Sequence, residues 1–139
     1  MVSYNYEIDF SIDDEDKYTT WIESIIESEG FMAGEINYIF CSDEYLHKIN
    51  IEYLDHDTYT DIISFDYTEG RIISGDIFIS IDRVRDNALD LGVLISEELL
   101  RVMSHGILHY CGYLDKTDEE ERTMRSKEDE KIRLFHVEQ

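Results

Sequence analysis

Two histidines four positions apart, His105 and His109, constrain this chain more than any other feature. On an α-helix, residues with this spacing lie one turn apart and point in the same direction. Gly112 follows and tolerates a positive φ, so the helix can end and the chain can turn back to bring Asp115 beneath the imidazoles. Three protein ligands with a fourth position open to water are typical of catalytic zinc sites. The stretch therefore predicts one Zn²⁺ held by His105, His109 and Asp115.

The offsets of this stretch are those of the zinc-binding helix of the metzincin proteases. Those proteases carry a glutamate directly after the first histidine, and it acts as the general base. Here that position is Gly106, which has no side chain. An i,i+4 histidine pair alone is a weak signal, and two buried core histidines or a purely structural metal are the alternatives. With Gly112 and Asp115 at the right offsets, the stretch predicts a metal site that lacks the protease base.

Length and composition indicate one globular domain over residues 1–139, with apolar residues making up 42% of the chain. Cys41 and Cys111 are the two cysteines, which favours reduced thiols in a cytosol. The sequence contains no apolar run as long as a membrane span and opens on no targeting segment. We therefore expect a cytoplasmic protein with no membrane partner.

The formal net charge of −21 argues against a nucleic-acid partner, because affinity for nucleic acid is built largely from phosphate neutralisation. However, 33 acidic residues spread over helix faces are often only solvated surface. A local basic patch can persist inside such a protein. The charge therefore lowers the expectation of RNA binding without excluding it, and no DNA partner is expected.

The hydrophobic pattern predicts an α+β domain with a small mixed sheet of about four strands, and with the histidine helix packed centrally against it. Strands are expected over residues 1–10, 35–41, 61–67 and 71–81, the last two as a hairpin. A polar loop is expected over residues 55–60. Helix starts are expected at five capping residues. These residues are Asp13 (or Ser11), Ser42 (or Asp43), Asp82, Ser96 and Thr117.

Side-chain spacing predicts which helix faces are buried. In the second helix, Leu46, Ile49 and Tyr53 are expected to face inward. The last helix, which opens with a capping box of Thr117 and Glu120, is expected to be largely solvated. Three i,i+4 ion pairs are expected on it. They are Asp118 with Arg122, Glu121 with Arg125, and Asp129 with Arg133.

The stretch His105-Gly-Ile-Leu-His-Tyr-Cys-Gly-Tyr-Leu-Asp115 resembles the core motif of the YbeY family of bacterial rRNA maturation factors. Thr60-Asp-Ile-Ile-Ser-Phe65 and Gly75-Asp-Ile77 are similar to two further segments of that family. Two positions depart from the family pattern. Asp115 stands where the family usually has a third histidine, and Leu54 stands where it often has an arginine. A carboxylate remains a legitimate zinc ligand.

The resemblance implies a metal-dependent, single-strand-specific endoribonuclease. It would act in 16S rRNA 3′-end maturation and ribosome quality control, with rRNA and the ribosomal small subunit as partners. Arg101, one turn before His105, is the candidate for stabilising charge during catalysis, although a surface pairing with Glu97 or Glu98 is an equal alternative. If RNA binds, five cations are expected to border the site. They are Arg71, Arg83, Arg85, Arg101 and Lys116.

Two other function classes stay open from the residues alone. One is a metallopeptidase or other metal-dependent hydrolase with a base from elsewhere, which an extended edge strand beside the metal would favour. The other is a non-enzymatic ribosome-assembly factor, which a closed four-ligand metal would favour. A basic cleft leading to the metal would favour the endoribonuclease.

Overall fold

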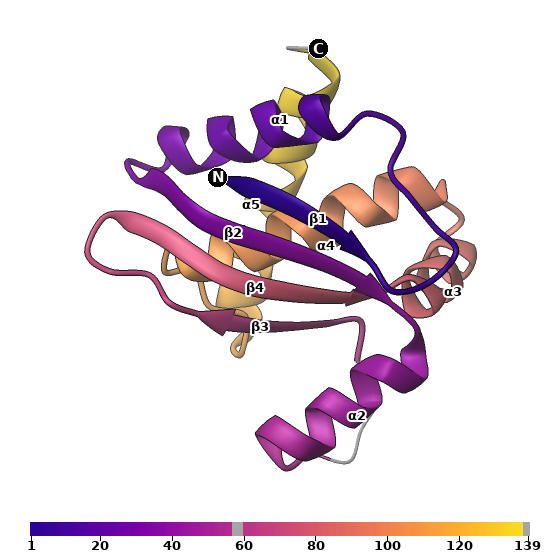
Figure 1. Cartoon of the computed structure of the whole chain (residues 1–139). Coiled ribbons are helices and arrows are strands. Elements are labelled where there is room, and N and C mark those ends of the chain that lie inside the picture. The colour runs from indigo at the N-terminus through magenta and orange to yellow at the C-terminus, as the bar shows by residue number, and fades with distance from the viewer. Residues whose placement is uncertain (57–59, 138–139) are drawn as a thin grey trace.

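The chain forms five helices and a four-stranded sheet within residues 1–56 and 60–137, the part that the computed structural model describes (Figure 1). In chain order the elements are β1 (Val2–Tyr6), α1 (Glu15–Ser28), β2 (Met32–Cys41), α2 (Asp43–Leu54), β3 (Ile62–Asp66), β4 (Ile72–Ser80), α3 (Ile81–Leu91), α4 (Ile95–Tyr110) and α5 (Asp118–Val137). This arrangement confirms the expected α+β class. Residues 57–59 of the expected polar loop lie outside the described residues.

The sheet is mixed, with the strand order β1-β2-β4-β3. β1, β2 and β4 run parallel. α1 returns the chain between β1 and β2, whereas α2 and the antiparallel strand β3 lie between β2 and β4. β3 pairs antiparallel with β4, which confirms the expected hairpin, and it occupies one edge. β1 and β3 are therefore the two edge strands of the sheet.

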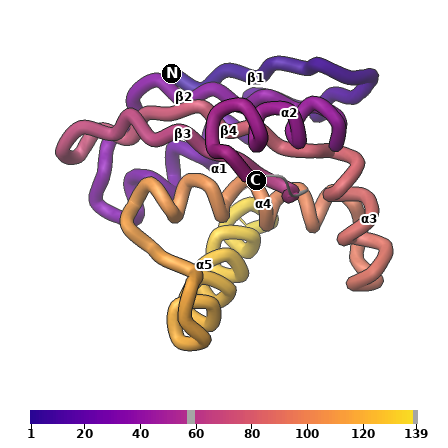
Figure 2. The backbone as a smooth tube through the Cα atoms, turned by 90° about the horizontal axis from the view of Figure 1, so that it is seen from below, coloured from indigo at the N-terminus to yellow at the C-terminus, as the bar shows by residue number. Residues whose placement is uncertain are grey.

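Helices cover the two faces of the sheet unequally. α1, α4 and α5 lie on one side, as Figure 2 shows from below. Ile36, Tyr38 and Phe40 alternate along β2 and point into the main core on that side. α2 packs on β3 and β4, where a smaller apolar cluster includes Leu46 and Ile63. Among the described residues, no helix is both long enough and apolar enough to span a membrane.

α4, the helix that carries both histidines, is the central helix, and it contacts α1, α3, α5, β3 and β4. The buried hydroxyl of Tyr38 on β2 donates to the carbonyl oxygen of Met103 at 3.0 Å. At the other end of α4, the Tyr110 hydroxyl donates to the carbonyl oxygen of Phe65 at 3.0 Å. These bonds fix α4 against both the middle and the edge of the sheet. The central position expected for the histidine helix is confirmed.

Several expected details of the helices are wrong. Ser80, not Asp82, caps α3, because β4 leaves Ser80 extended and its hydroxyl accepts the backbone N–H of Arg83 at 3.1 Å. α4 begins at Ile95, one residue before Ser96, and Leu94 at its N-cap makes no side-chain cap bond. Tyr53 is 65% exposed rather than inward, because it sits at the end of α2 with its ring against the edge of Phe65. α1 begins after Asp14 instead of Asp13.

α5 is less solvated than its charge suggests. The expected capping box is present, since Glu120 N–H donates to the Thr117 hydroxyl at 3.1 Å and Thr117 N–H donates to the Glu120 carboxylate at 3.0 Å. However, one face of α5 is buried, and it includes the charged residues Glu128 and Lys131. Asp129 pairs with Arg101 on α4 rather than with Arg133. The buried face makes α5 part of the core.

A buried ion pair joins α1 to α5. The Glu29 carboxylate lies 2.8 Å from the Lys131 ammonium, and it accepts a hydrogen bond from the Tyr113 hydroxyl at 2.7 Å. Burial alone would raise the pKa of Glu29, but the hydrogen bonds from Lys131 and Tyr113 and the charge of Lys131 outweigh it and lower that pKa to about 2. Tyr113 belongs to the turn between His109 and Asp115, so this pair also anchors the turn that completes the histidine site.

We expect Glu29→Gln to lower the free energy of unfolding at pH 7 by about 1.5–3 kcal/mol, because hydrogen bonds to a charged group are lost. Since the pKa of Glu29 is depressed in the folded state, its contribution is present above its ordinary value and is lost as the pH falls toward the folded value of about 2. Urea unfolding of both proteins across this range should therefore show the difference shrinking as the pH falls. Exposed Glu27→Gln is the control. A pH-independent difference, or one no larger than that of the control, would contradict this role of Glu29.

Candidate metal centre

The last turns of α4 place the two imidazoles side by side. His105 and His109 are separated by one helical turn, and their Nε2 atoms lie 2.9 Å apart. Both side chains are partly exposed, 21% for His105 and 30% for His109. They therefore border the core without being enclosed by it, as a metal ligand with access to solvent requires.

The turn after α4 brings the third side chain to the pair. Gly112 has a φ of +104°, which lets the chain reverse directly after the helix. Asp115 Oδ2 then lies 3.2 Å from His105 Nε2 and 3.3 Å from His109 Nε2. Donors at zinc-ligand distances in a tetrahedron lie about 3.3 Å from one another. The structure thus brings together the three side chains that the sequence singled out, in a group that could hold one ion.

The other ring nitrogen of each histidine is also held. His109 Nδ1 lies 2.9 Å from the carbonyl oxygen of Tyr113, and His105 Nδ1 lies 2.6 Å from Glu128 Oε2. Because both partners are acceptors, each Nδ1 is assigned the proton, and each Nε2 keeps its lone pair for the centre of the group. Such outer hydrogen bonds are usual for metal-binding histidines.

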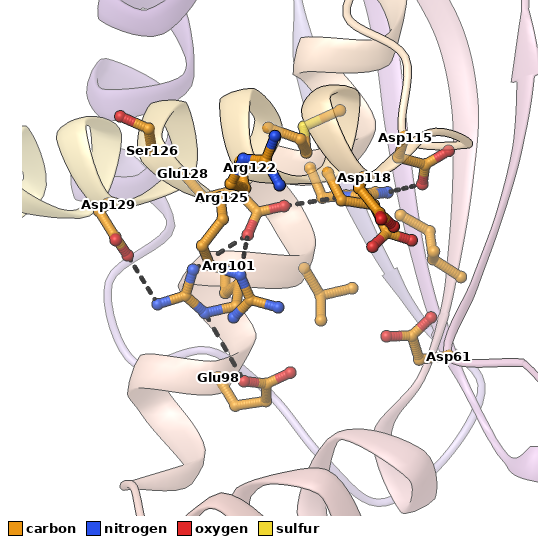
Figure 3. Close-up of a pocket in the computed structure, with 15 residues that line it drawn as sticks. Asp61, Glu98, Arg101, Asp115, Asp118, Arg122, Arg125, Ser126, Glu128 and Asp129 are labelled. Carbon is orange, nitrogen blue, oxygen red and sulfur yellow. Dashed lines mark hydrogen bonds and ion pairs between the residues drawn. The ribbon is translucent and has the colours of Figure 1, made fainter.

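A cavity of about 940 Å³ opens beside this group. His105 and Asp115 line it, and Figure 3 shows Asp129 and Asp115 at opposite ends, with Glu98 beside Arg101. The cavity is formed by α4, α5 and the start of β3. In total it is lined by three arginines and seven acidic residues. The site is therefore an open, strongly acidic hollow that a substrate can enter.

Burial alters the proton affinities of the groups around the cavity. It raises the pKa of Asp61 and that of Glu98, whose Oε1 has no hydrogen-bond partner. Burial opposes protonation of His105, but the hydrogen bond and charge of Glu128 outweigh it and raise the pKa of His105. Perturbed carboxylates lining an open cavity are typical of functional sites.

Comparison with known proteins agrees with this geometry. The sequence profile of the family described as Endoribonuclease YbeY matches residues 3–136. A protein of Flavobacterium johnsoniae named Endoribonuclease YbeY is 65% identical over 139 residues, which is all of both chains. Its namesake in Flavobacterium psychrophilum is 63% identical over all of this chain and 99% of its own length. The chain belongs to the YbeY endoribonuclease family.

A solved structure supports the fold independently. The solution structure of TM1509 from Thermotoga maritima superposes with a TM-score of 0.68 and covers 99% of this chain and 91% of its own. It is only 23% identical, so it bears on the fold alone. The family resemblance read from the His105–Asp115 stretch is confirmed over nearly the whole chain by the sequence profile and the relatives, and the solved structure adds the fold.

Arg101 lines the cavity, and one of its two expected partners, Glu98, is among its ion pairs. Its guanidinium lies 3.0 Å from Glu128 and 2.9 Å from Asp129, both on α5. Glu98 is more distant, at 3.9 Å, and Glu97 instead contacts His136 at 2.7 Å. Arg101 therefore ties α4 to α5 beside the metal group.

The other expected cations do not gather at the site. Arg71 stacks over Phe31, and Arg83 pairs with Asp43 at 2.8 Å. Of the five basic residues expected there, only Arg101 is among the described residues that line the cavity. Arg71 directly precedes β4, and Arg83 and Arg85 lie on α3, and neither element contributes a residue to the lining of the cavity. Arg122 and Arg125 of α5, which the sequence predicts in surface ion pairs, line it instead.

Glu128 and Asp61 were missed as site residues. Glu128 lies 23 positions from His105, and the charge of its helix suggested a solvated surface. A signal was present, because Met124, Glu128, Lys131 and Phe135 recur at helical spacing and form one buried stripe. Asp61 belongs to the family-like segment Thr60–Phe65, and it lines the cavity directly before β3.

His105→Ala is expected to lose stoichiometric metal, whereas Asp115→His should keep it, because an imidazole can replace a carboxylate ligand at this position. Elemental analysis after dialysis against limiting chelator measures both. His136→Ala removes an exposed histidine of α5 outside the group and is the matched control. Full occupancy in His105→Ala would reject the ligand assignment.

Proposed function

We propose that this chain, residues 1–139 acting as one YbeY-like hydrolase domain, is a metal-dependent, single-strand-specific endoribonuclease. The proposed task is 16S rRNA 3′-end maturation and ribosome quality control in the cytoplasm, with rRNA on the ribosomal small subunit as partner. The observation that carries this proposal is the open group of His105, His109 and Asp115 at the end of a large cavity, in a family whose members are named endoribonucleases. No described residue offers a fourth side-chain ligand to this group.

We propose Zn²⁺ as the ion, bound through His105 Nε2, His109 Nε2 and Asp115 Oδ2. When bound with an open position, such an ion polarises a phosphoryl oxygen and lowers the pKa of water. The role of the chain is to hold the three donors in place and to leave Nε2 of each imidazole unprotonated, so that its lone pair faces the ion. The carboxylate makes the group less positive than three histidines would.

Arg101 is proposed to stabilise the charge that develops on the phosphate. It lines the cavity one turn before His105 and remains 22% exposed. The two short ion pairs to α5 use Nη1 and Nη2, and a guanidinium has five N–H donors. Donors therefore remain for a phosphate oxygen, and the ion pairs hold the guanidinium plane in position.

RNA suits this site better than a peptide because it brings its own nucleophile. A 2′-hydroxyl next to the scissile phosphate can attack phosphorus once its proton is removed. A 2′,3′-cyclic phosphate then forms as the bond from phosphorus to the 5′-oxygen breaks, and the 5′-oxygen takes a proton from solvent. We propose Asp61 as the proton acceptor, since it lines the same cavity as His105 and burial raises its pKa, which makes a carboxylate a stronger base. The protease position after His105 is Gly106 and supplies no base.

A metallopeptidase is the second candidate, and one observation favours it. β3 is an edge strand that contacts α4, and its start borders the cavity. An extended peptide can pair with such an edge. The absence of a base at Gly106 counts against this candidate, and the two functions differ in the substrate that is cleaved.

The Zn²⁺-loaded protein is expected to cleave a single-stranded RNA that spans the 3′ end of 16S rRNA, and to leave duplex RNA and peptides intact. Chelator and His109→Ala should abolish cleavage, whereas Asp61→Asn should keep the metal and lose about 10²–10⁴-fold in rate. His136→Ala should keep both. Gel analysis of end-labelled RNA, peptide cleavage and metal content are measured on the same preparations.

Two results would contradict the proposal. RNA cleavage that persists in His109→Ala with chelator would belong to a contaminating nuclease. Metal-dependent peptide cleavage without action on RNA, even on isolated small subunits, would assign the metallopeptidase function instead.

A further inference from the structure

Glu128 is a buried carboxylate without a task in the proposed reaction. Glu128 is 3% exposed and lies in the middle of α5, which packs against α4. One oxygen, Oε2, lies 2.6 Å from His105 Nδ1, and the other, Oε1, lies 3.0 Å from Arg101 Nη1. Both oxygens are thus engaged by α4, which leaves the carboxylate a single orientation.

Arg101 completes this contact from the other side. Its guanidinium holds Glu128 Oε1 and also binds Asp129 at 2.9 Å. Arg101 and His105 lie one turn apart on α4, so Glu128 inserts between an arginine and an imidazole of the same helix. The buried charge of Glu128 is compensated by Arg101, and a buried carboxylate without such a partner would be strongly disfavoured.

The two histidines are oriented by different means. His109 Nδ1 is held by the backbone carbonyl of Tyr113, which no side-chain substitution removes. His105 Nδ1 is held by the side chain of Glu128, which comes from a separate helix. Only the orientation of His105 therefore depends on the docking of α5 and can be removed by one substitution.

We propose that Glu128 is the positioning residue of the metal centre. It accepts the Nδ1 proton of His105, which leaves Nε2 unprotonated and aimed at His109 and Asp115. Arg101 keeps Glu128 in that position. The inference rests on the proposed metal function, and it adds that metal affinity is controlled by a side chain of α5 that does not touch the ion.

If Glu128 only neutralised Arg101, neither the metal affinity nor the position of the His105 ring proton would depend on it. Glu128→Ala removes both contacts, whereas Glu128→Gln keeps the length of the side chain but has one acceptor oxygen for the two donors, Arg101 Nη1 and His105 Nδ1. Asp129→Asn is the matched control, because Asp129 is the neighbouring acidic partner of Arg101 and lies outside the metal group. The thermal midpoint of each metal-free protein measures the structural contribution separately.

The test measures Zn²⁺ affinity of the full chain by competition with a chromogenic chelator. Glu128→Ala should bind about 10–100-fold more weakly, the range seen when an outer partner of a metal-binding histidine is lost. Glu128→Gln should fall between Glu128→Ala and the wild type, and Asp129→Asn should match the wild type. Equal affinity for Glu128→Ala and the wild type would overturn the proposal.

A second readout needs no metal. Long-range ¹H–¹⁵N spectra of the metal-free protein at about pH 9, above the ordinary histidine pKa, report which nitrogen of His105 carries the proton. The wild type should show the proton on Nδ1, and Glu128→Ala should shift it toward Nε2. An Nδ1 proton retained in Glu128→Ala would overturn the proposal. If the wild type binds no metal, the proposed function fails, while these spectra still decide the role of Glu128.

Discussion

The close approach of α4 to the sheet is the constraint on which the rest of this structure depends. A side chain at Gly106 would begin 3.1 Å from Ile62 Cδ1 and 3.2 Å from Ile77 Cδ1. Glycine at this position lets the helix lie near β3 and β4, and it brings the cavity-lining start of β3 close to His105. Gly106, which leaves the site without the protease base, therefore also lets the helix pack, because this position of α4 faces the sheet.

Local chemistry explains what the sequence could predict. The Thr117–Glu120 capping box, the hairpin and the offsets of His105, His109 and Asp115 each depend on residues a few positions apart. Such features follow from helix and turn geometry that neighbouring residues determine. The family resemblance could be read from the same short segments.

Long-range packing explains what could not be predicted. Glu128 and Asp129 contact Arg101 from 27 and 28 positions away, so its partners depend on how α5 crosses α4. Ser80 caps α3 because β4 ends there, and a capping pattern alone also allowed Asp82. Arg83 binds Asp43 of α2, which is 40 positions away in the sequence, and does not line the cavity. In each case the partner is set by tertiary structure rather than by the spacing of residues.

The acidic surroundings of the metal group affect how RNA would be bound. Three arginines line the cavity against seven acidic residues, in a chain of net charge −21. Phosphate contacts supply most nucleic-acid affinity, so such a site holds free RNA weakly. Under the proposed function, attachment to the small subunit provides the substrate at high effective concentration. The acids near the ion, Glu128 above all, then serve the metal site rather than the RNA.

X-ray absorption spectroscopy at the zinc edge of the loaded protein tests the central claim most directly. The account predicts two imidazole ligands, one carboxylate oxygen and further light scatterers from solvent, with no sulfur. A sulfur ligand from Cys111, a third imidazole, or a spectrum with fewer than two imidazoles would contradict the metal centre described for His105, His109 and Asp115.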